Sequence, residues 1–202
     1  MADYDEILLD VVIRSLSGAR YPISDARELL PDRPGLYAIH APREDWTFLG
    51  LVHRTEVPLY VGKAEDSLVS RDLNTHFAVD PEATVKTGSS TVRRSFAALL
   101  RKSLNLQGVP RNKLKPGYFA HYGLEDEADG RLTEWMQGHL SLAYWQLPRH
   151  PKCKLADLEK AVLKQWDPPI NLQSSPTKLP HLMAERAAMK IEARVWAEEN
   201  GH

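Results

Sequence analysis

The chain lacks several features that would each assign it to a class of protein. Its 202 residues include one cysteine, Cys153, which excludes an internal disulfide and a metal site of the CxxC type. No apolar run approaches the roughly 20 residues that span a bilayer, so we expect no membrane partner. The N-terminus, MADYDEILLD, is acidic where a secretory signal is basic. We therefore expect no export and a reducing, cytoplasmic compartment.

Acidic residues are missing from one long internal stretch. The net charge of −1 does not indicate a nucleic-acid partner, but no Asp or Glu occurs between Glu82 and Glu125. The basic residues of this stretch are Lys86, Arg93, Arg94, Arg101, Lys102, Arg111, Lys113 and Lys115. A local basic field is typical of phosphate contact. From charge alone, a solvated helix face followed by a lysine-rich loop is the simpler interpretation.

The hydrophobic pattern predicts an α+β fold. The segments GLYAIH (35–40) and PLYVG (58–62) have the pattern of two antiparallel strands of a hairpin, separated by an irregular insert over 41–57. Helical periodicity predicts further helices over 4–16, 67–77, 87–102, 131–140, 154–166 and 180–199, and strands are predicted over 116–124 and 141–147. We expect a small mixed or antiparallel sheet led by the hairpin and flanked by helices.

The predicted helix over 87–102 carries two of the basic residues. Ser89, Ser90 and Thr91 are candidate N-caps. At 100° per residue, Arg94 and Arg101 fall opposite an apolar face formed by Val92, Phe96, Leu99 and Leu100. The two arginines are then placed to contact either a phosphate backbone or water.

Glu159 breaks the pattern of the predicted helix over 154–166. On a helical wheel it falls inside the apolar stripe of Leu155, Leu158 and Val162. A carboxylate there is costly unless a cation or a hydrogen-bond network pairs with it. A structural ion pair and a bound divalent cation are the two alternative partners for this carboxylate. Of the divalent cations, magnesium suits a lone carboxylate because it keeps several of its waters. No His/Cys cluster has zinc spacing.

Taken in order, several residues resemble the GIY-YIG nuclease domain. The tripeptides GLY (35–37) and YVG (60–62) resemble the two half-motifs of that family. Downstream follow the remaining positions of its active-site pattern, which here are Lys63, Arg71, His76, Glu159 and, in PPIN, Asn171. The chain is similar to restriction-type bacterial members over about residues 33–173. The resemblance implies a nuclease domain over 31–175 with inserts at 41–57 and 80–120, an N-terminal helical extension over 1–30 and a C-terminal helix over 176–202.

The same resemblance implies a role for each matched residue. Tyr37, assisted by Tyr60, activates the attacking water, and His76 relays a proton. Arg71 and Lys63 stabilise the negative charge of the transition state. The remaining implied roles are a Mg²⁺ or Mn²⁺ ion on Glu159, a bracing contact from Asn171, and structural turns at Gly35 and Gly62. Taken singly, each of these residues also has a simpler structural interpretation. The tyrosines are then aromatic side chains that fill a face of the sheet, Arg71 forms a surface ion pair, and His76 lies at the end of a helix.

Two departures from the family pattern affect these expectations. The two motif tyrosines are 23 residues apart because of the insert, where members commonly have a shorter connection. His76 follows Arg71 by five residues, where the family often has four. On a regular helix that shift rotates His76 by about 100°.

The function expected from these observations is Mg²⁺-dependent endonuclease activity on DNA, most simply on duplex. The basic residues Arg93, Arg94, Arg101 and Lys102 are predicted to hold the DNA backbone. The terminal helices are predicted to allow a homodimer, because cutting both strands with one site per chain is easiest as a dimer. The alternative is a catalytically silent nucleic-acid-binding or regulatory protein on the same fold.

Overall fold

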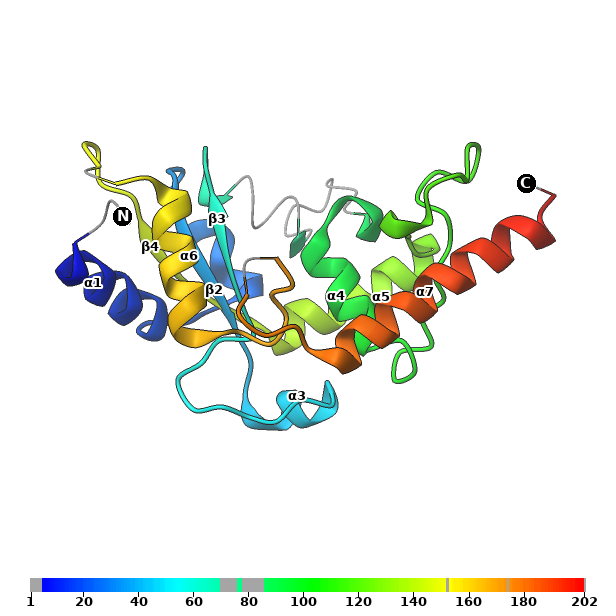
Figure 1. Ribbon diagram of the computed structural model, residues 1–202, viewed down its shortest axis with the longest axis horizontal. Helices are drawn as coiled ribbons and strands as arrows, with labels where there is room; N and C mark the ends of the chain where they lie inside the picture. Colours follow the sequence, from blue (N-terminus) through cyan, green and yellow to red (C-terminus); the bar gives the residue numbers. More distant parts are fainter. Residues whose placement is uncertain (1–4, 70–75, 78–85, 152, 174, 202) are drawn as a thin grey trace.

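The computed structural model describes residues 5–69, 76–77, 86–151, 153–173 and 175–201. The molecule is elongated, with a small sheet and helices α1 (Glu6–Ser17) and α6 (Leu155–Trp166) at one end. Helices α4 (Thr91–Leu99), α5 (Asp126–His139) and α7 (Pro180–Glu199) lie at the other end (Figure 1). The two termini are at opposite ends. The remaining short elements are α2 (Ala26–Leu29), α3 (Arg43–Phe48), and the 3₁₀ turns η1 (Ile23–Asp25), η3 (Thr87–Ser89) and η4 (Phe119–His121).

The sheet has four antiparallel strands in the order β1-β4-β2-β3. These strands are β1 (Tyr21–Pro22), β2 (Gly35–His40), β3 (Tyr60–Ala64) and β4 (Ser141–Gln146). Every residue of β2 is buried, as its unbroken hydrophobic run suits a central strand. β3 is an edge strand, which leaves one side of its backbone for other partners.

Two hydrophobic cores lie on the two faces of the sheet. On one face, Val12 and Leu16 of α1 and Leu158 and Val162 of α6 cover Val61 and its neighbours. The larger core, on the other face, joins the sheet to α4, α5 and α7. Because α1 completes the first core, the segment predicted as an N-terminal extension packs directly on the sheet.

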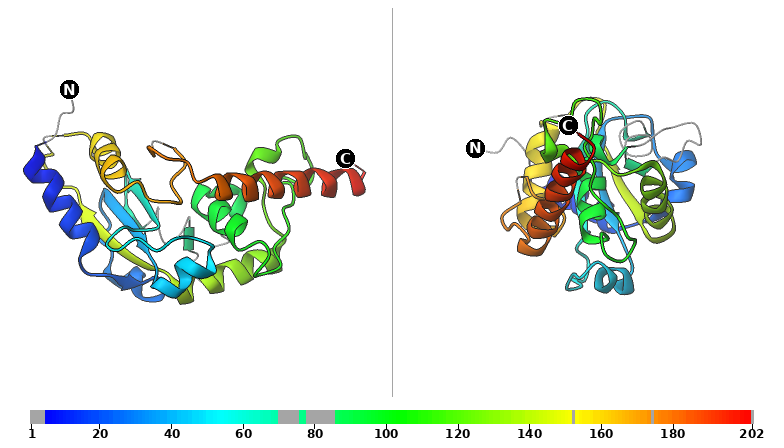
Figure 2. Two further views of the ribbon diagram at one scale, coloured as in Figure 1. Left: turned by 60° about the horizontal axis from the view of Figure 1, so that its bottom comes forward. Right: turned by 90° about the vertical axis from the view of Figure 1, so that its right-hand side faces the viewer.

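The C-terminal helix α7 is docked along α4 (Figures 1 and 2). Leu182, Met189, Ala193 and Ala197 form its buried face. A Cβ on Gly108 would lie 2.2 Å from the carbonyl oxygen of Met189, so the loop before η4 can approach this helix only as glycine.

Three expectations about local structure are corrected. The insert 41–57 contains a helix, α3, and α5 begins at Asp126, five residues before the helix predicted over 131–140. Acidic side chains suit the first turn of a helix because they face its positive dipole end. The strand predicted over 116–124 is replaced by η4, with Gly123 forming only an isolated bridge to Val109. Most of the helix predicted over 67–77 lies outside the described residues.

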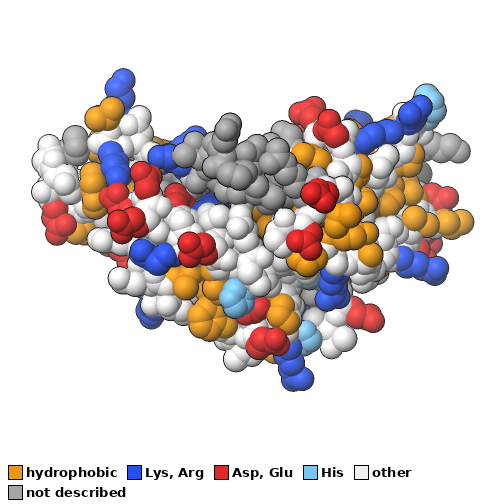
Figure 3. Space-filling view, turned by 180° about the vertical axis from the view of Figure 1, so that it is seen from behind, with side chains coloured by type: hydrophobic (Ala, Val, Ile, Leu, Met, Phe, Trp, Pro, Cys, Tyr) orange, Lys and Arg blue, Asp and Glu red, His pale blue; other side chains and the backbone are white. Residues whose placement is uncertain are grey.

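One face of the molecule shows how the charged side chains are distributed. Viewed from behind, acidic and basic side chains alternate over the surface without a large area of one sign (Figure 3). Among the helices that the structure describes, none is long and apolar enough to cross a membrane.

Candidate active site

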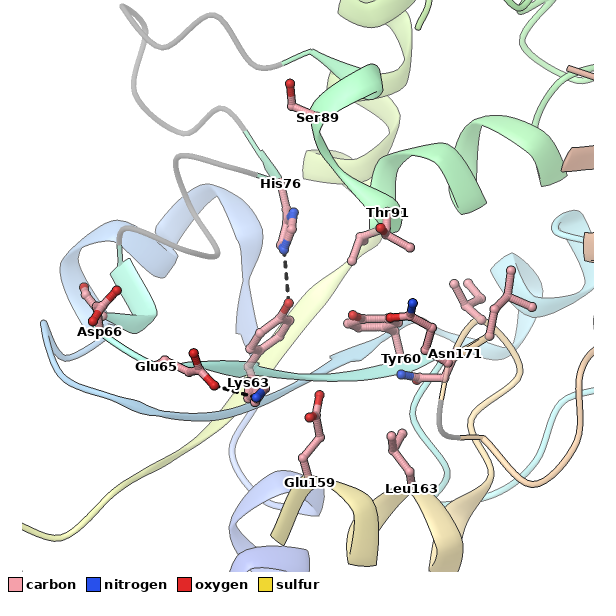
Figure 4. Close-up of a pocket in the computed structure, with 16 residues that line it drawn as sticks. Tyr60, Lys63, Glu65, Asp66, His76, Ser89, Thr91, Glu159, Leu163 and Asn171 are labelled. Atoms are coloured by element: carbon pink, nitrogen blue, oxygen red, sulfur yellow. Dashed lines mark hydrogen bonds and ion pairs between the residues drawn. The ribbon is translucent and has the colours of Figure 1, made fainter. Parts of the chain in front are cut away.

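A cavity of about 520 Å³ opens at the β3 edge of the sheet (Figure 4). It brings together six of the predicted site residues, which are Tyr37, Tyr60, Lys63, His76, Glu159 and Asn171. The rest of its wall comes from Glu65, Asp66, Ser67, the start of α4 and residues 170–173. Segments that are more than 100 residues apart in the sequence therefore meet around one hollow.

The position of β3 at the edge explains how both faces of the sheet contribute. Tyr37 pairs with Gly62 and Ile39 with Tyr60 across the two strands, so both tyrosines lie on the same face. Their ring centroids are 6.0 Å apart. Lys63 directly follows Gly62 in β3, so its side chain lies on the opposite face of the sheet, which α6 covers. Glu159 points from α6 towards this edge (Figure 4).

His76 is the centre of a buried hydrogen-bond chain. Its Nε2 lies 3.1 Å from the Tyr37 hydroxyl, the contact marked by the dashed line at His76 in Figure 4. Its Nδ1 lies 2.8 Å from Ser90 Oγ. Ser90 is also the N-cap of α4, where its Oγ accepts a hydrogen bond from the backbone N–H of Arg93. The imidazole, 2% exposed, is thus fixed between a helix cap and the motif tyrosine despite its shifted spacing. The Ser-Ser-Thr cap pattern marked this helix start in the sequence, but its contact with His76 needed the tertiary structure.

Gly62 makes room for the Tyr37 ring. A Cβ at this position would lie 2.5 Å from both Cζ and the hydroxyl oxygen of Tyr37. Gly62 is in the middle of β3, and Gly35 begins β2, where a Cβ would lie 2.2 Å from the Trp145 carbonyl oxygen. The expectation that both glycines form turns is therefore wrong. Both lie in strands, where the missing side chain lets the Tyr37 ring or the Trp145 backbone come close.

Asn171 completes the edge of the sheet. Its Oδ1 accepts a hydrogen bond from Val61 N at 2.9 Å, and its Nδ2 donates one to Val61 O at 2.8 Å. The side-chain amide thus takes the place that a neighbouring strand would occupy. Ile170 N donates to Leu59 O at 3.0 Å, which extends the same pairing. Asn171 fixes the strand that carries Tyr60 and Lys63.

The donor set around Glu159 fits a hard divalent cation. The carboxylate is partly buried in a pocket that also holds the carboxylates of Glu65 and Asp66. Among the described residues, no group of three or more His, Cys, Asp or Glu side chains could enclose a metal. A single carboxylate with room for waters suits Mg²⁺ or Mn²⁺ better than zinc. Lys63 Nζ lies 2.5 Å from Glu65 Oε1, so one acidic wall residue is already paired.

Two of the residues predicted to bind nucleic acid are buried. Arg93 is 0% exposed and donates to Asp129 Oδ1 at 3.0 Å, and Arg94 is 4% exposed. The expectation that Arg94 lies on an outer face of the helix is wrong, because every residue of α4 from Val92 to Leu99 is buried. Burial lowers the pKa of Arg93, while Asp129 opposes that shift. The described position of Arg93 leaves it no access to a DNA backbone.

Arg101 and Lys102 sit against α7. Arg101 forms ion pairs with Glu185 at 2.8 Å and Glu192 at 2.7 Å. Lys102 lies 3.7 Å from Glu185 with its side chain 78% exposed. The placement of Arg101 on a free surface is therefore also corrected, since its charge is neutralised by the C-terminal helix. Arg71, the remaining predicted site residue, lies outside the described residues.

Comparison with known proteins identifies the family. A family model described as the GIY-YIG catalytic domain matches residues 38–189. No curated protein and no solved structure gave a match. Members of this family are nucleases, so the match assigns nuclease chemistry and a nucleic-acid substrate to the domain. The match covers most of the chain, which therefore belongs to the GIY-YIG nuclease superfamily.

Proposed function

We propose that this protein is a metal-dependent endonuclease that hydrolyses phosphodiester bonds in DNA at the β3 edge. The observation that carries the proposal is the hydrogen bond between Tyr37 and His76 in the same cavity as Glu159. A pair able to move a proton and a carboxylate able to hold a cation are the two requirements of phosphodiester hydrolysis by water.

The proton path starts at the attacking water. The water gives its proton to the Tyr37 oxygen as the hydroxyl proton of Tyr37 passes to His76 Nε2. This direction requires the neutral imidazole to carry its hydrogen on Nδ1, which donates to Ser90 Oγ. Ser90 can accept because its oxygen has two lone pairs, one of which receives the Arg93 N–H.

Positive charge around the phosphate completes the mechanism. A divalent cation held by Glu159 would polarise the scissile phosphate and stabilise the leaving oxygen. Lys63, with its side chain 29% exposed at the rim, can move from Glu65 to the incoming phosphate. The resemblance also implies that Arg71 stabilises the negative charge of the phosphate, because a guanidinium matches two phosphate oxygens. Tyr60, whose ring centroid lies 6.0 Å from that of Tyr37, helps to orient the water.

A Glu159→Ala variant tests this proposal. The parent and the variant are incubated with plasmid and single-stranded DNA, each with Mg²⁺, Mn²⁺ or EDTA. We expect metal-dependent cutting by the parent only. Cutting that persists in EDTA or in the variant contradicts the proposed role of Glu159. DNA binding without cutting by the parent would favour the silent binding protein.

A homodimer remains part of the proposal. Ile7 is 72% exposed on α1 and Ile191 is 62% exposed on α7, so both terminal helices retain apolar side chains at the surface. Two copies of the pocket would allow cleavage of both strands of a duplex. Light scattering at several concentrations checks this: a mass that stays at 22.9 kDa contradicts the dimer.

A further inference from the structure

Most cations of the acid-free stretch 83–124 are neutralised by carboxylates from elsewhere. The ion pairs are Lys86–Asp126, Arg93–Asp129, Arg101 with Glu185 and Glu192, Lys102–Glu185, and Lys113–Glu125. Within the described part of the chain, Arg94 and Arg111 form no ion pair with a carboxylate. Arg186 of α7 forms none either.

These three arginines converge on one turn of backbone. Arg94 donates to Gly88 O at 2.7 Å and to Thr91 Oγ1 at 2.9 Å. Arg186 Nη1 lies 2.9 Å from Ser95 Oγ and 3.5 Å from Thr91 O. Arg111 Nη2 lies 3.4 Å from Ser89 Oγ. We call Arg94, Arg111 and Arg186 the arginine cluster.

The members of the arginine cluster act on one another electrostatically. Burial, and then the charges of Arg186 and Arg111, lower the pKa of Arg94 to about 10. The pKa of His121 is lowered by burial and then by all three arginines. Positive charges that are held close together and lower the pKa of their neighbours are typical of a site that receives an anion.

The cluster retains hydrogen-bond donors for such an anion. A guanidinium has five N–H donors, and Arg111 and Arg186 each use only one nitrogen within the described structure. Arg111 is exposed and Arg186 partly exposed. Arg94 Nε is buried without a hydrogen-bond partner.

The cluster adjoins the catalytic cavity. Ser89 and Thr91, which the arginines contact, also line that cavity and lie above Tyr60 (Figure 4). Tyr118 is 66% exposed, and its ring packs edge-on against His121 at 4.9 Å. An exposed aromatic beside unpaired cations is typical of surfaces that bind nucleic acid.

We propose that the arginine cluster binds a backbone phosphate of the nucleic acid next to the one cut in the cavity, with Arg111 and Arg186 as the accessible donors, Arg94 adding its charge from the buried side, and Tyr118 stacking on a nearby base. This inference rests on the proposed function for the identity of its ligand. The cluster joins α4, the loop before η4 and α7, so the C-terminal helix becomes part of the substrate site.

The test is the salt dependence of DNA binding. Fluorescence anisotropy measures the affinity for a labelled duplex, with Ca²⁺ in place of Mg²⁺, at several NaCl concentrations. The variant Arg111→Ala/Arg186→Ala spares the buried Arg94, and Arg14→Ala/Arg43→Ala removes two exposed charges from α1 and α3 as the matched control. Arg111→Lys/Arg186→Lys keeps the charges. Circular dichroism melting verifies that each variant folds.

We expect the double alanine variant to bind roughly 10- to 100-fold more weakly at 0.1 M salt, with the slope of log K against log[salt] reduced by about one to two. The lysine variant and the control should keep most of the parent's slope. An unchanged slope in the double alanine variant, an equal loss in the control, or a parent that binds no duplex overturns the inference.

Cleavage assays separate this inference from the proposed function. A parent that cuts DNA, with an unchanged KM in the double alanine variant, refutes the arginine cluster alone. A parent whose binding depends on the cluster but that cuts nothing with Mg²⁺ or Mn²⁺ refutes the proposed function and leaves the cluster in place as a binding site.

Discussion

Replacing Gly62 by alanine should disable the site while leaving most of the fold intact. The new Cβ would lie 2.5 Å from the Tyr37 ring, about 0.9 Å inside ordinary van der Waals contact, which begins at 3.4 Å. Tyr37 is 1% exposed, so its ring can yield only by moving away from His76 or by displacing its neighbours. The 3.1 Å bond from the Tyr37 hydroxyl to His76 would then be broken or misaligned.

The magnitude of this effect follows from the displacement. Overpacking of this kind costs about 1–3 kcal/mol of folding free energy. A shift of about 1 Å in a catalytic group costs roughly 100-fold in rate. We therefore expect Gly62→Ala to lower the cleavage rate about 100-fold while the Tm falls by only several degrees.

The assay compares single-turnover cleavage and thermal unfolding across a matched set of variants. Gly130→Ala and Gly138→Ala in α5 add the same methyl group where nothing lies within 4 Å. These controls should gain about 1 kcal/mol of stability from helix propensity and cut normally. Full cleavage activity in Gly62→Ala would refute the placement of Tyr37 over this glycine.

Two further predictions concern stability. Asn171→Ala should lower the free energy of unfolding by about 2–4 kcal/mol, because both backbone groups of Val61 lose their buried partner; a loss below 0.5 kcal/mol in urea titration would contradict that bracing role. Burial, and then the charge of Arg20, lower the pKa of His40 to about 4 from its usual 6.5, so the unfolded chain binds the proton first. The contribution of His40 to the free energy of unfolding, about 3 kcal/mol, should be complete above pH 6.5 and lost as the pH falls to 4. An equally steep loss of stability in His40→Gln would contradict the assignment of this pH dependence to His40.

Much of the secondary structure could be predicted because local patterns determine it. The strand at 35–40 and the helix at 180–199 have the predicted bounds, since an unbroken apolar run and a long helical periodicity that starts at a proline leave few alternatives. The strand predicted over 116–124 was wrong because Phe119–His121 form a turn of 3₁₀ helix that packs against α7. Sequence alternation alone does not distinguish these two environments.

The site could be predicted only in part, because order along the chain gives residue types and not contacts. Tyr37, Tyr60, His76 and Glu159 line one cavity as the family pattern implied, and their catalytic roles stay predictions. The helical wheel failed for Arg94 because it assumes one solvent face, whereas α4 is enclosed by the neighbouring helices and the cavity wall. The hydrogen-bond partners of Arg93 come from distant segments, at His76, Asp129 and Thr133.

The central claim is that Tyr37 and His76 act as one proton-transferring unit in the cavity. A double-mutant cycle tests it most directly, with single-turnover cleavage measured for Tyr37→Phe, His76→Ala and the combined variant. If the two side chains act as a unit, the combined variant should lose no more rate than the worse of the single variants. Losses that multiply, or single variants that cut at the parent's rate, would contradict it.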